Sequence, residues 1–227
     1  MVQRMSAGAP YEDPMPEADP LHHTTAADGD GELNAFLQKE AHEHRLAFDA
    51  FMGALGAPFA QMLELWDASI RQGGKLLVFG NGGSAGNAQH LATELVVRYE
   101  KDRAAIAALA LTADSLLLSA AANDLGFEAL FSRQIAGLGC RGDVAVGIST
   151  SGRSPNVLAG LREARARGLH TSGLIGRDGG EMRALCDVAI VVPSQVTARI
   201  QEMHLLVTHM LCKALEQRHG SGNGTIR

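Results

Sequence analysis

His90 and Glu94 are a pair of residues that could do chemistry together. They lie four positions apart in residues 84–99, whose apolar spacing predicts a helix, so both side chains project from one helix face. An imidazole and a carboxylate at this spacing can share a divalent metal ion or act as an acid–base pair. Such pairs are also common on exposed helix surfaces, and the two residues alone leave that interpretation open.

Gln201 and His209 form a second pair, in the closing helix expected over residues 198–217. They are two helical turns apart and therefore lie on roughly the same side of that helix. His209 stands among apolar residues, so it could equally be a core histidine with one satisfied hydrogen bond. His204 is the competing candidate, but it faces away from His209, so we do not expect both to serve one site.

Two glycine- and serine-rich turns follow apolar runs that predict strands. The first is Gly80-Asn81-Gly82-Gly83-Ser84, and the second is Ser149-Thr150-Ser151-Gly152-Arg153-Ser154. A strand that passes through such a turn into a helix presents backbone N–H groups and hydroxyls at the helix N-terminus, which suits phosphate or another anion. Two such turns in one α/β unit indicate a phosphorylated ligand at the carboxyl ends of parallel strands.

The alternation of strands with helices predicts the fold class. Strands are expected at residues 75–79, 105–111, 143–148, 171–175 and 188–192. The helices between them are expected to include one that begins after Thr112 as its N-cap and ends near Asn123 and Asp124, which form either a capping turn or an edge for sugar hydroxyls. We therefore expect a three-layer α/β sandwich with a mainly parallel, five-stranded sheet.

Composition divides the chain into three parts. Residues 1–30 are proline-rich and acidic, with little apolar periodicity, and are expected to be a disordered extension; residues 219–227 are expected to be a disordered tail. The domain proper would be residues 31–218. It would begin with a pair of amphipathic helices over residues 31–72, separated at Gly56-Ala57-Pro58, whose apolar faces need a partner surface.

Bulk properties argue against several classes of function. A net charge of −5 and an aromatic content of 4% do not suit a nucleic-acid surface. The apolar stretches are too short to span a membrane, and the first residues lack the apolar core of a signal peptide. Three scattered cysteines suggest neither a disulfide framework nor a thiolate zinc site, so we expect a cytoplasmic protein.

Five motifs in this order resemble the sugar-isomerase (SIS) domain family, which has a flavodoxin-like fold, and within it the phosphoheptose isomerases. The resemblance covers residues 32–217 or so. The motifs are Gly80-Asn81-Gly82-Gly83-Ser84, His90-x-x-x-Glu94, Asn123-Asp124, Ser149-Thr150-Ser151-Gly152-x-Ser154 and Arg199-Ile200-Gln201-Glu202.

The resemblance implies roles for the matching residues. It implies one zinc ion per subunit on His90, Glu94, Gln201 and His209, with Glu94 and His209 as the catalytic acid–base groups. It implies a phosphate cradle of Ser149, Thr150, Ser151 and Ser154. Sugar contacts would come from Asn81, Gly82, Gly83, Ser84, Asn123 and Asp124, with Glu94 and Gln201 also touching substrate.

The resemblance further implies a homotetramer with sites at subunit interfaces, acting on sedoheptulose 7-phosphate through an enediol to form D-glycero-D-manno-heptose 7-phosphate. Two positions depart from the family pattern. Ala198 replaces an acidic residue that some members carry, and Arg153 occupies a loop position that is often small or polar and could add charge near the phosphate.

Two alternatives share the fold. One is a non-enzymatic regulator that binds the replication initiator DnaA; that relative lacks the helix glutamate and the second closing-helix histidine, whereas this chain has Glu94 and His209. The other is an enzyme for another sugar phosphate, such as an amino-sugar isomerase or a muramic acid 6-phosphate etherase. The short single domain and the set of four predicted metal ligands argue against it.

Overall fold

The structure is a computed structural model that describes residues 26–220, with side chains from residue 30. The predictions for residues 1–25 and 221–227 lie outside the described residues. Two units separate along the chain: residues up to Glu40, and residues from Ala41 onward, which hold the sheet and every candidate site residue. The elements are α1 (Ala26–Arg71), β1 (Leu76–Gly80), α2 (Gly83–Val96), β2 (Ala108–Ala110), α3 (Ser115–Leu125), the 3₁₀ turn η1 (Phe127–Ala129), α4 (Leu130–Leu138), β3 (Val144–Ser149), α5 (Pro155–Ala166), β4 (His170–Gly176), α6 (Met182–Leu185), β5 (Val188–Val192) and α7 (Thr197–His219).

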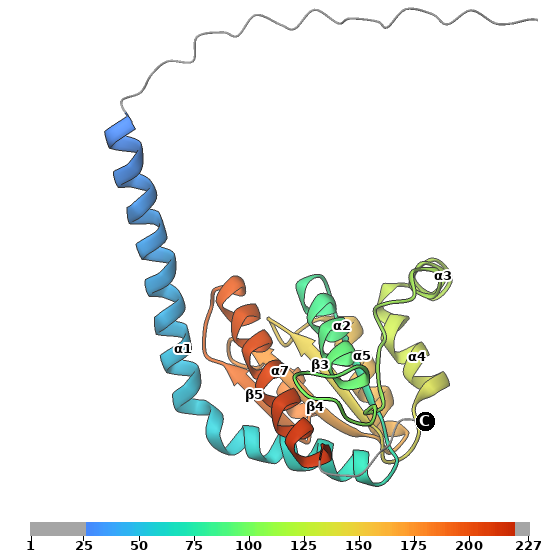
Figure 1. Cartoon of the computed structure of the whole chain (residues 1–227). Helices are drawn as coiled ribbons and strands as arrows, with labels where there is room; N and C mark the ends of the chain where they lie inside the picture. The colour runs from blue at the N-terminus through green and yellow to red at the C-terminus, as the bar shows by residue number, and fades with distance from the viewer. Residues whose placement is uncertain (1–25, 221–227) are drawn as a thin grey trace, which may run out of the picture. The chain divides into compact units, whose positions relative to one another are not determined.

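The five strands form one parallel sheet in the order β2-β1-β3-β4-β5 (Figure 1). Leu76 of β1 pairs with Ala108 of β2 on one side and with Val144 of β3 on the other. This is the flavodoxin-like order, so the predicted fold class is confirmed. The winding reverses between β1 and β3, and open sheets of this kind bind ligands at the carboxyl ends of such a strand pair.

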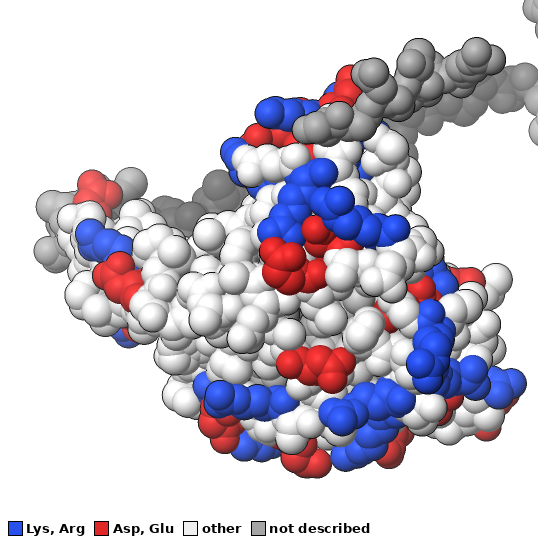
Figure 2. All heavy atoms as spheres, turned by 90° about the horizontal axis from the view of Figure 1, so that it is seen from below, with Lys and Arg blue, Asp and Glu red and all other residues white. Residues whose placement is uncertain are grey.

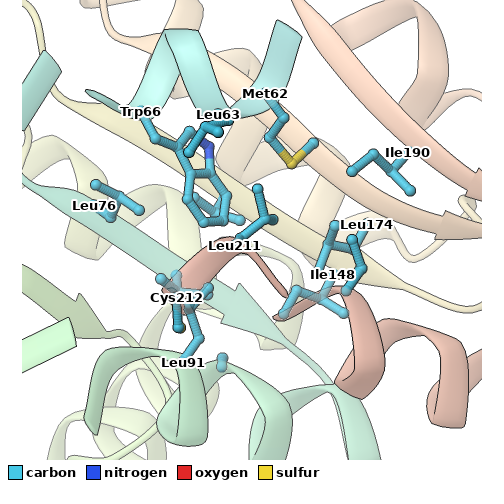
Figure 3. Close-up of a cluster of buried hydrophobic side chains, with 14 of the residues drawn as sticks. Met62, Leu63, Trp66, Leu76, Leu91, Ile148, Leu174, Ile190, Leu211 and Cys212 are labelled. Carbon is cyan, nitrogen blue, oxygen red and sulfur yellow. The ribbon is translucent and has the colours of Figure 1, made fainter. Parts of the chain in front are cut away.

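Alternate strand residues face two different helical layers. Leu76 and Val78 of β1 belong to a buried cluster with residues of α1, α2 and α7. Leu77 and Phe79 belong to a second cluster with residues of α3, α4 and α5. Figure 3 shows part of the first cluster, with Trp66 of α1 beside Leu76 and Leu211. Because both faces of the sheet are covered, its strands are continuous apolar runs.

The N-terminal helices form one helix, α1, with Pro58 inside it, so the expected break into a pair is wrong. The α1 ribbon bends in its cyan part (Figure 1). Phe51, Leu55, Met62 and Trp66 are buried and recur at helical spacing on both sides of the proline. Their shared packing offsets the backbone hydrogen bond that proline cannot make, and the helix continues through it. The helix also starts before residue 31, the expected boundary.

The boundaries around α3 differ from the prediction. Asp114, not Thr112, is the N-cap, because its carboxylate accepts a hydrogen bond from the Leu117 N–H at 2.9 Å. The Thr112 hydroxyl instead donates to the Ala85 carbonyl on α2 at 3.3 Å. The helix then continues to Leu125, and β2 is shorter than the predicted strand.

An 18-residue window of α1, within residues 30–71, has a mean hydropathy of 1.3 and passes a length-and-composition criterion for a membrane span. This differs from the expectation that the apolar stretches are too short. Core helices of globular domains and signal sequences meet the same criterion; 28% of this window is buried, although Phe51, Met62 and Trp66 of α1 are fully buried. The window is therefore weak evidence for a membrane.

The face seen from below in Figure 1 carries both signs of charge. Figure 2 shows its lysine and arginine side chains lying beside aspartate and glutamate side chains. Ion pairs of this kind join α1 to α7, where Arg218 contacts both Glu64 and Asp67. Asp67 is buried, so its pair with Arg218 is not a simple surface pair, whereas the exposed pairs of mixed sign on this face add little to stability.

Candidate active site

The two glycine- and serine-rich turns meet at the switch point of the sheet. The first follows β1 and leads into α2, and the second follows β3 and leads into α5. Since β1 and β3 are neighbours and parallel, their carboxyl ends lie side by side. The sheet topology therefore brings together two segments that are about seventy residues apart in the sequence, as the anion-site hypothesis requires.

The serine loop gathers three hydroxyl groups. Ser149 Oγ lies 3.2 Å from Ser154 Oγ and 3.5 Å from Ser151 Oγ, and it accepts a hydrogen bond from the Gly152 N–H at 3.1 Å. Gly152 has a φ of 65°, a conformation that favours glycine. Ser154 precedes α5 but makes no capping hydrogen bond with its side chain. These hydroxyls are grouped as a phosphate cradle needs, beside the backbone of Thr150.

The first turn brings α2 against α7. Gly82 precedes α2 with a φ of 54°, and a Cβ atom built on Gly83 would lie 2.4 Å from Gln201 Nε2. Only glycine at position 83 lets the Gln201 side chain of α7 approach this backbone so closely. Ser84 is buried, and its N–H donates to the Asn81 carbonyl at 3.0 Å. The predicted glycines thus shape the turn around Gln201.

Asn156 is a residue that the sequence analysis missed. Its side-chain amide makes two reciprocal hydrogen bonds with the Asn81 amide, each 2.8 Å long. The Asn156 side chain is buried at the start of α5, and its Oδ1 also accepts from the Val157 N–H. This reciprocal pair, the Asn81–Asn156 clamp, joins the first turn to the segment that follows the serine loop. An asparagine after Ser154-Pro155 was its only sequence signal.

The histidine cluster joins α2 to α7. His90 Nε2 lies 2.8 Å from His209 Nε2, so one of these nitrogens carries the proton and the other accepts it. Glu94 Oε1 lies 3.7 Å from His90 Nε2. The Tyr99 ring, which sequence reasoning missed, lies 5.6 Å from the His209 ring between centroids. The two helices therefore bring His90, Glu94 and His209 together, as predicted.

A hollow of about 530 Å³ lies between α2 and α7 beside this cluster. Asn87 lines it with both side-chain amide atoms buried and without a hydrogen-bond partner in the structure. Glu202, another lining residue, accepts from His44 of α1 at 2.7 Å and pairs with Arg199 at 2.8 Å. The full lining is Gly83, Gly86, Asn87, His90, Ala198, Gln201, Glu202, Leu205 and His209.

A smaller hollow of about 170 Å³ also borders the first turn, with Asn81, Gly82 and Thr112 in its lining. Gly82 thus borders this hollow, and Gly83 borders the one beside the histidines. Asn81 of the same turn is hydrogen-bonded to Asn156, which lies two residues after the serine loop. The first turn therefore contacts both the segment that follows the serine loop and the helix that carries His209.

The predicted metal ligands His90, Glu94 and His209 lie near one another but do not form a closed metal site. Within residues 30–220, no three His, Cys, Asp or Glu side chains are grouped tightly enough for a formed metal site. The donor types nevertheless suit zinc, which binds imidazole nitrogens and carboxylate oxygens. Tetrahedral bonds of about 2.0–2.1 Å place ligand atoms about 3.3 Å apart. The 2.8 Å and 3.7 Å separations around His90 lie close to that spacing.

His204 is not part of this cluster. It is buried on α7, and that burial lowers the pKa of its imidazole to about 4. A histidine in this environment is neutral at physiological pH. His209, which borders the hollow, is therefore the closing-helix histidine that can meet a ligand.

Asn123 and Asp124 lie apart from the histidine cluster within this chain. Both are exposed in the last turn of α3, where Asn123 Nδ2 donates to Asp124 Oδ1 at 2.7 Å. Asp124 lines a different hollow of about 550 Å³ between α3 and α4, which is mostly apolar. This hollow is slightly larger than the one beside the histidines, but its lining lacks the predicted acid–base groups, so we take the hollow beside the histidines as the candidate active site. The sugar-contact role of this pair stays a prediction.

The chain resembles proteins of one family along most of its length. Residues 43–176 match the SIS domain family. A phosphoheptose isomerase of Paramagnetospirillum magneticum is 53% identical over 181 residues, which are 80% of this chain and 94% of that protein. Phosphoheptose isomerase 1 of Campylobacter jejuni is 49% identical over 181 residues, 80% of this chain and 97% of that protein.

Solved structures agree with these relatives. The phosphoheptose isomerase GmhA from Neisseria gonorrhoeae is similar with a TM-score of 0.77 and 40% identity, over 82% of this chain and 99% of that chain. A phosphoheptose isomerase from Francisella tularensis has a TM-score of 0.74 and 32% identity, over 86% and 100% respectively. These matches confirm the enzyme interpretation over the regulator. The chain belongs to the SIS domain family and, within it, to the phosphoheptose isomerases, and it is a sugar phosphate isomerase.

Proposed function

We propose that this enzyme converts D-sedoheptulose 7-phosphate to D-glycero-D-manno-heptose 7-phosphate. The observation that carries the proposal is that one glycine turn contacts the segment directly after the serine loop, through the Asn81–Asn156 hydrogen bonds, and also borders the hollow beside His90 and His209, through Gly83. A substrate with phosphate at one end and a reacting carbonyl at the other needs both features. The names of the relatives, which refer to a phosphorylated heptose, support the same substrate class.

The reaction moves one proton between two carbons through an enediol. A base removes a proton from C1 of the ketose while the C2 oxygen gains one; a proton then returns to C2, and the C1 hydroxyl loses its own to form the aldehyde. We assign Glu94 as the base at carbon and His209 as the group that moves the proton at oxygen. The serine loop binds the remote phosphate and so positions the reacting end.

We further propose that His90, Glu94, Gln201 and His209 hold one zinc ion. When bound, zinc would polarise the substrate carbonyl and stabilise negative charge on its oxygen. Gln201 lines the same hollow as the two histidines, so an oxygen ligand is available beside the imidazoles. A carboxylate that binds zinc is a weaker base, so the metal role and the direct acid–base role of Glu94 compete.

We propose that the enzyme is a homotetramer in the cytoplasm, with its sites completed at subunit interfaces. Large apolar side chains that stay exposed on the single chain support an association of copies, and they include Leu46, Phe48 and Met52 of α1 and Leu116 and Leu125 of α3. Mass photometry would test the oligomeric state. A monomer that turns over substrate at nanomolar concentration would contradict the shared site.

Turnover of sedoheptulose 7-phosphate by the purified protein tests the reaction, before and after chelation and with zinc restored. Activity that is lost on chelation and recovered with zinc supports the metal-assisted mechanism. Activity that persists after chelation keeps the isomerase and assigns Glu94 and His209 to direct acid–base roles. Absence of turnover under all conditions, with other sugar phosphates turned over, would contradict the substrate assignment.

A further inference from the structure

The ion pair of Arg153 and Asp178 lies directly beside the serine loop. Both terminal guanidinium nitrogens of Arg153 donate to the Asp178 carboxylate, Nη1 at 3.0 Å and Nη2 at 2.7 Å. Asp178 belongs to the loop between β4 and α6, and Arg153 is inside the serine loop itself. The pair therefore joins two neighbouring loops at the carboxyl ends of β3 and β4, which are adjacent strands.

The backbones of these two loops touch. A Cβ atom on Gly152 would lie 2.2 Å from the Gly179 carbonyl oxygen, and one on Gly180 would lie 2.6 Å from the Gly152 carbonyl oxygen. The Met182 N–H donates to that same Gly152 oxygen at 3.0 Å. Only glycine permits backbones to approach this closely. The β4–α6 loop is thus a support for the serine loop.

Arg153 also contacts Ser151, a residue of the serine loop. Its Nη1 donates to the Ser151 carbonyl at 3.2 Å, and its backbone N–H donates to Ser151 Oγ at 3.2 Å. Asp178 is held in turn by the Gly180 N–H at 3.2 Å. A continuous set of hydrogen bonds therefore runs from the Gly180 backbone through Asp178 and the Arg153 guanidinium to the Ser151 carbonyl, and the Arg153 backbone N–H separately holds the Ser151 hydroxyl.

We propose that Asp178 and Arg153 are positioning residues for phosphate binding: Asp178 orients the Arg153 guanidinium, and Arg153 pins Ser151 and balances the Asp178 charge beside the cradle. This inference rests on the proposed function of the serine loop as the phosphate site. It assigns Arg153, the position that departs from the family pattern, to affinity for the phosphate end and not to the isomerisation step.

Charge balance makes the proposal specific. Hydrogen bonds from Arg153 and from the Gly180 N–H lower the pKa of Asp178 to about 2, so this carboxylate is ionised at neutral pH. Without Arg153, a bare carboxylate would remain beside the site of a phosphate dianion and repel it. Removing the Asp178 charge as well should then restore part of the affinity, which a purely packing role would not produce.

The effect on folding should be small, because both side chains are at least half exposed. An exposed bidentate pair contributes little to the stability of a domain with a buried core. A matched control is the Arg167–Glu163 pair at the far end of α5, which is also an arginine–carboxylate pair on the surface. Arg167→Ala removes the same charge and should leave phosphate affinity unchanged.

The experiment measures inorganic phosphate binding by isothermal titration calorimetry at low salt, for the full-length protein and for three variants: Arg153→Ala, Arg153→Ala with Asp178→Asn, and Arg167→Ala. We expect Kd to rise about fivefold in Arg153→Ala, to recover to about twofold above wild type in the double variant, and to stay unchanged in Arg167→Ala. Melting temperatures without phosphate should agree among all four proteins.

Two results would overturn the inference: an Arg153→Ala variant that binds phosphate as wild type does, or a double variant that binds no more tightly than the single one. In parallel, Arg153→Ala should raise KM for sedoheptulose 7-phosphate by a similar factor and leave kcat nearly unchanged. If wild type shows no turnover while the order of phosphate affinities holds, the proposed reaction fails and the positioning pair stands. If the wild-type protein turns over sedoheptulose 7-phosphate but the variants do not show the expected order of phosphate affinities, only the inference about Arg153 and Asp178 fails.

Discussion

The serine loop and the histidine cluster serve the same proposed substrate but are built in different ways. The loop is six consecutive residues whose hydroxyls and amides bond to one another. The cluster is formed by two helices, and His90 and His209 are 119 positions apart. The loop is therefore preorganised mainly by local contacts, with the β4–α6 loop as its support, whereas the cluster depends on how α2 and α7 pack and on what binds between them.

The largest effect should come from the cluster. Glu94→Gln keeps the shape of the side chain and removes the proposed base, so kcat should fall by about 10²- to 10⁴-fold. Phosphate affinity should be retained, because the serine loop is unchanged. Steady-state turnover and phosphate titration measure the two properties separately. Glu100→Gln, the same change at an exposed carboxylate, is the control, and near-normal turnover by Glu94→Gln would rule out this role.

Glu216 tests how α2 and α7 are held together. Its carboxylate is buried on α7 and accepts the backbone N–H groups of Tyr99, Glu100 and Lys101, directly after α2. These contacts hold the segment that places the Tyr99 ring beside His209. Glu216→Gln should lower the free energy of unfolding by about 2 kcal/mol at pH 7. Urea unfolding measures this, and an unchanged midpoint would contradict it.

The pH dependence of that contribution has a definite sign. Burial favours the neutral form of Glu216, but the three backbone N–H groups and Arg103 outweigh it and lower the pKa of Glu216 below its usual 4.5. The unfolded chain therefore binds the proton more readily, and the stabilisation is present above about pH 4.5 and is lost as pH falls through the folded pKa. Unfolding curves of wild type and Glu216→Gln should approach each other below pH 4.

A smaller effect is expected in the serine loop. Ser154→Ala removes one cradle hydroxyl and should raise KM about tenfold, or about 1.4 kcal/mol, with kcat nearly unchanged. Ser151→Ala should act in the same direction. Ser132→Ala, which removes a hydroxyl that donates to the Ala129 carbonyl near α4, is the control. A fall in kcat at constant KM would show that the loop takes part in the chemical step.

The smallest effect should come from the clamp between the two turns. Asn156→Ala leaves the Asn81 amide without its partner, so we expect a loss of about 1 kcal/mol in stability and a rise in KM of about threefold. Asn156→Asp keeps the acceptor oxygen but adds negative charge near the proposed phosphate site, so it should raise KM more than Asn156→Ala does. Equal KM values for the two variants would show that charge at position 156 does not affect substrate binding.

Much of the architecture was predictable because each signal was local. Apolar runs followed by glycine or serine predicted the strands and the turns, and the strand β5 has the predicted bounds. The helical break at Pro58 was wrong because a proline signal is local, whereas the buried stripe of Phe51, Leu55, Met62 and Trp66 acts across it. The roles of Asn156 and Tyr99 could not be predicted, because their partners, Asn81 and His209, are distant in sequence.

The sequence by itself determined the α/β class, the two glycine- and serine-rich turns and the pairing of His90 with Glu94, since each depends on spacing within one element or on one strand–turn–helix segment. Only the tertiary structure decided which segments share a site. The strand order places the turns after β1 and β3 side by side, and the packing of α2 on α7 brings His209 to His90. Such contacts depend on the burial of both faces of the sheet, which no single segment specifies.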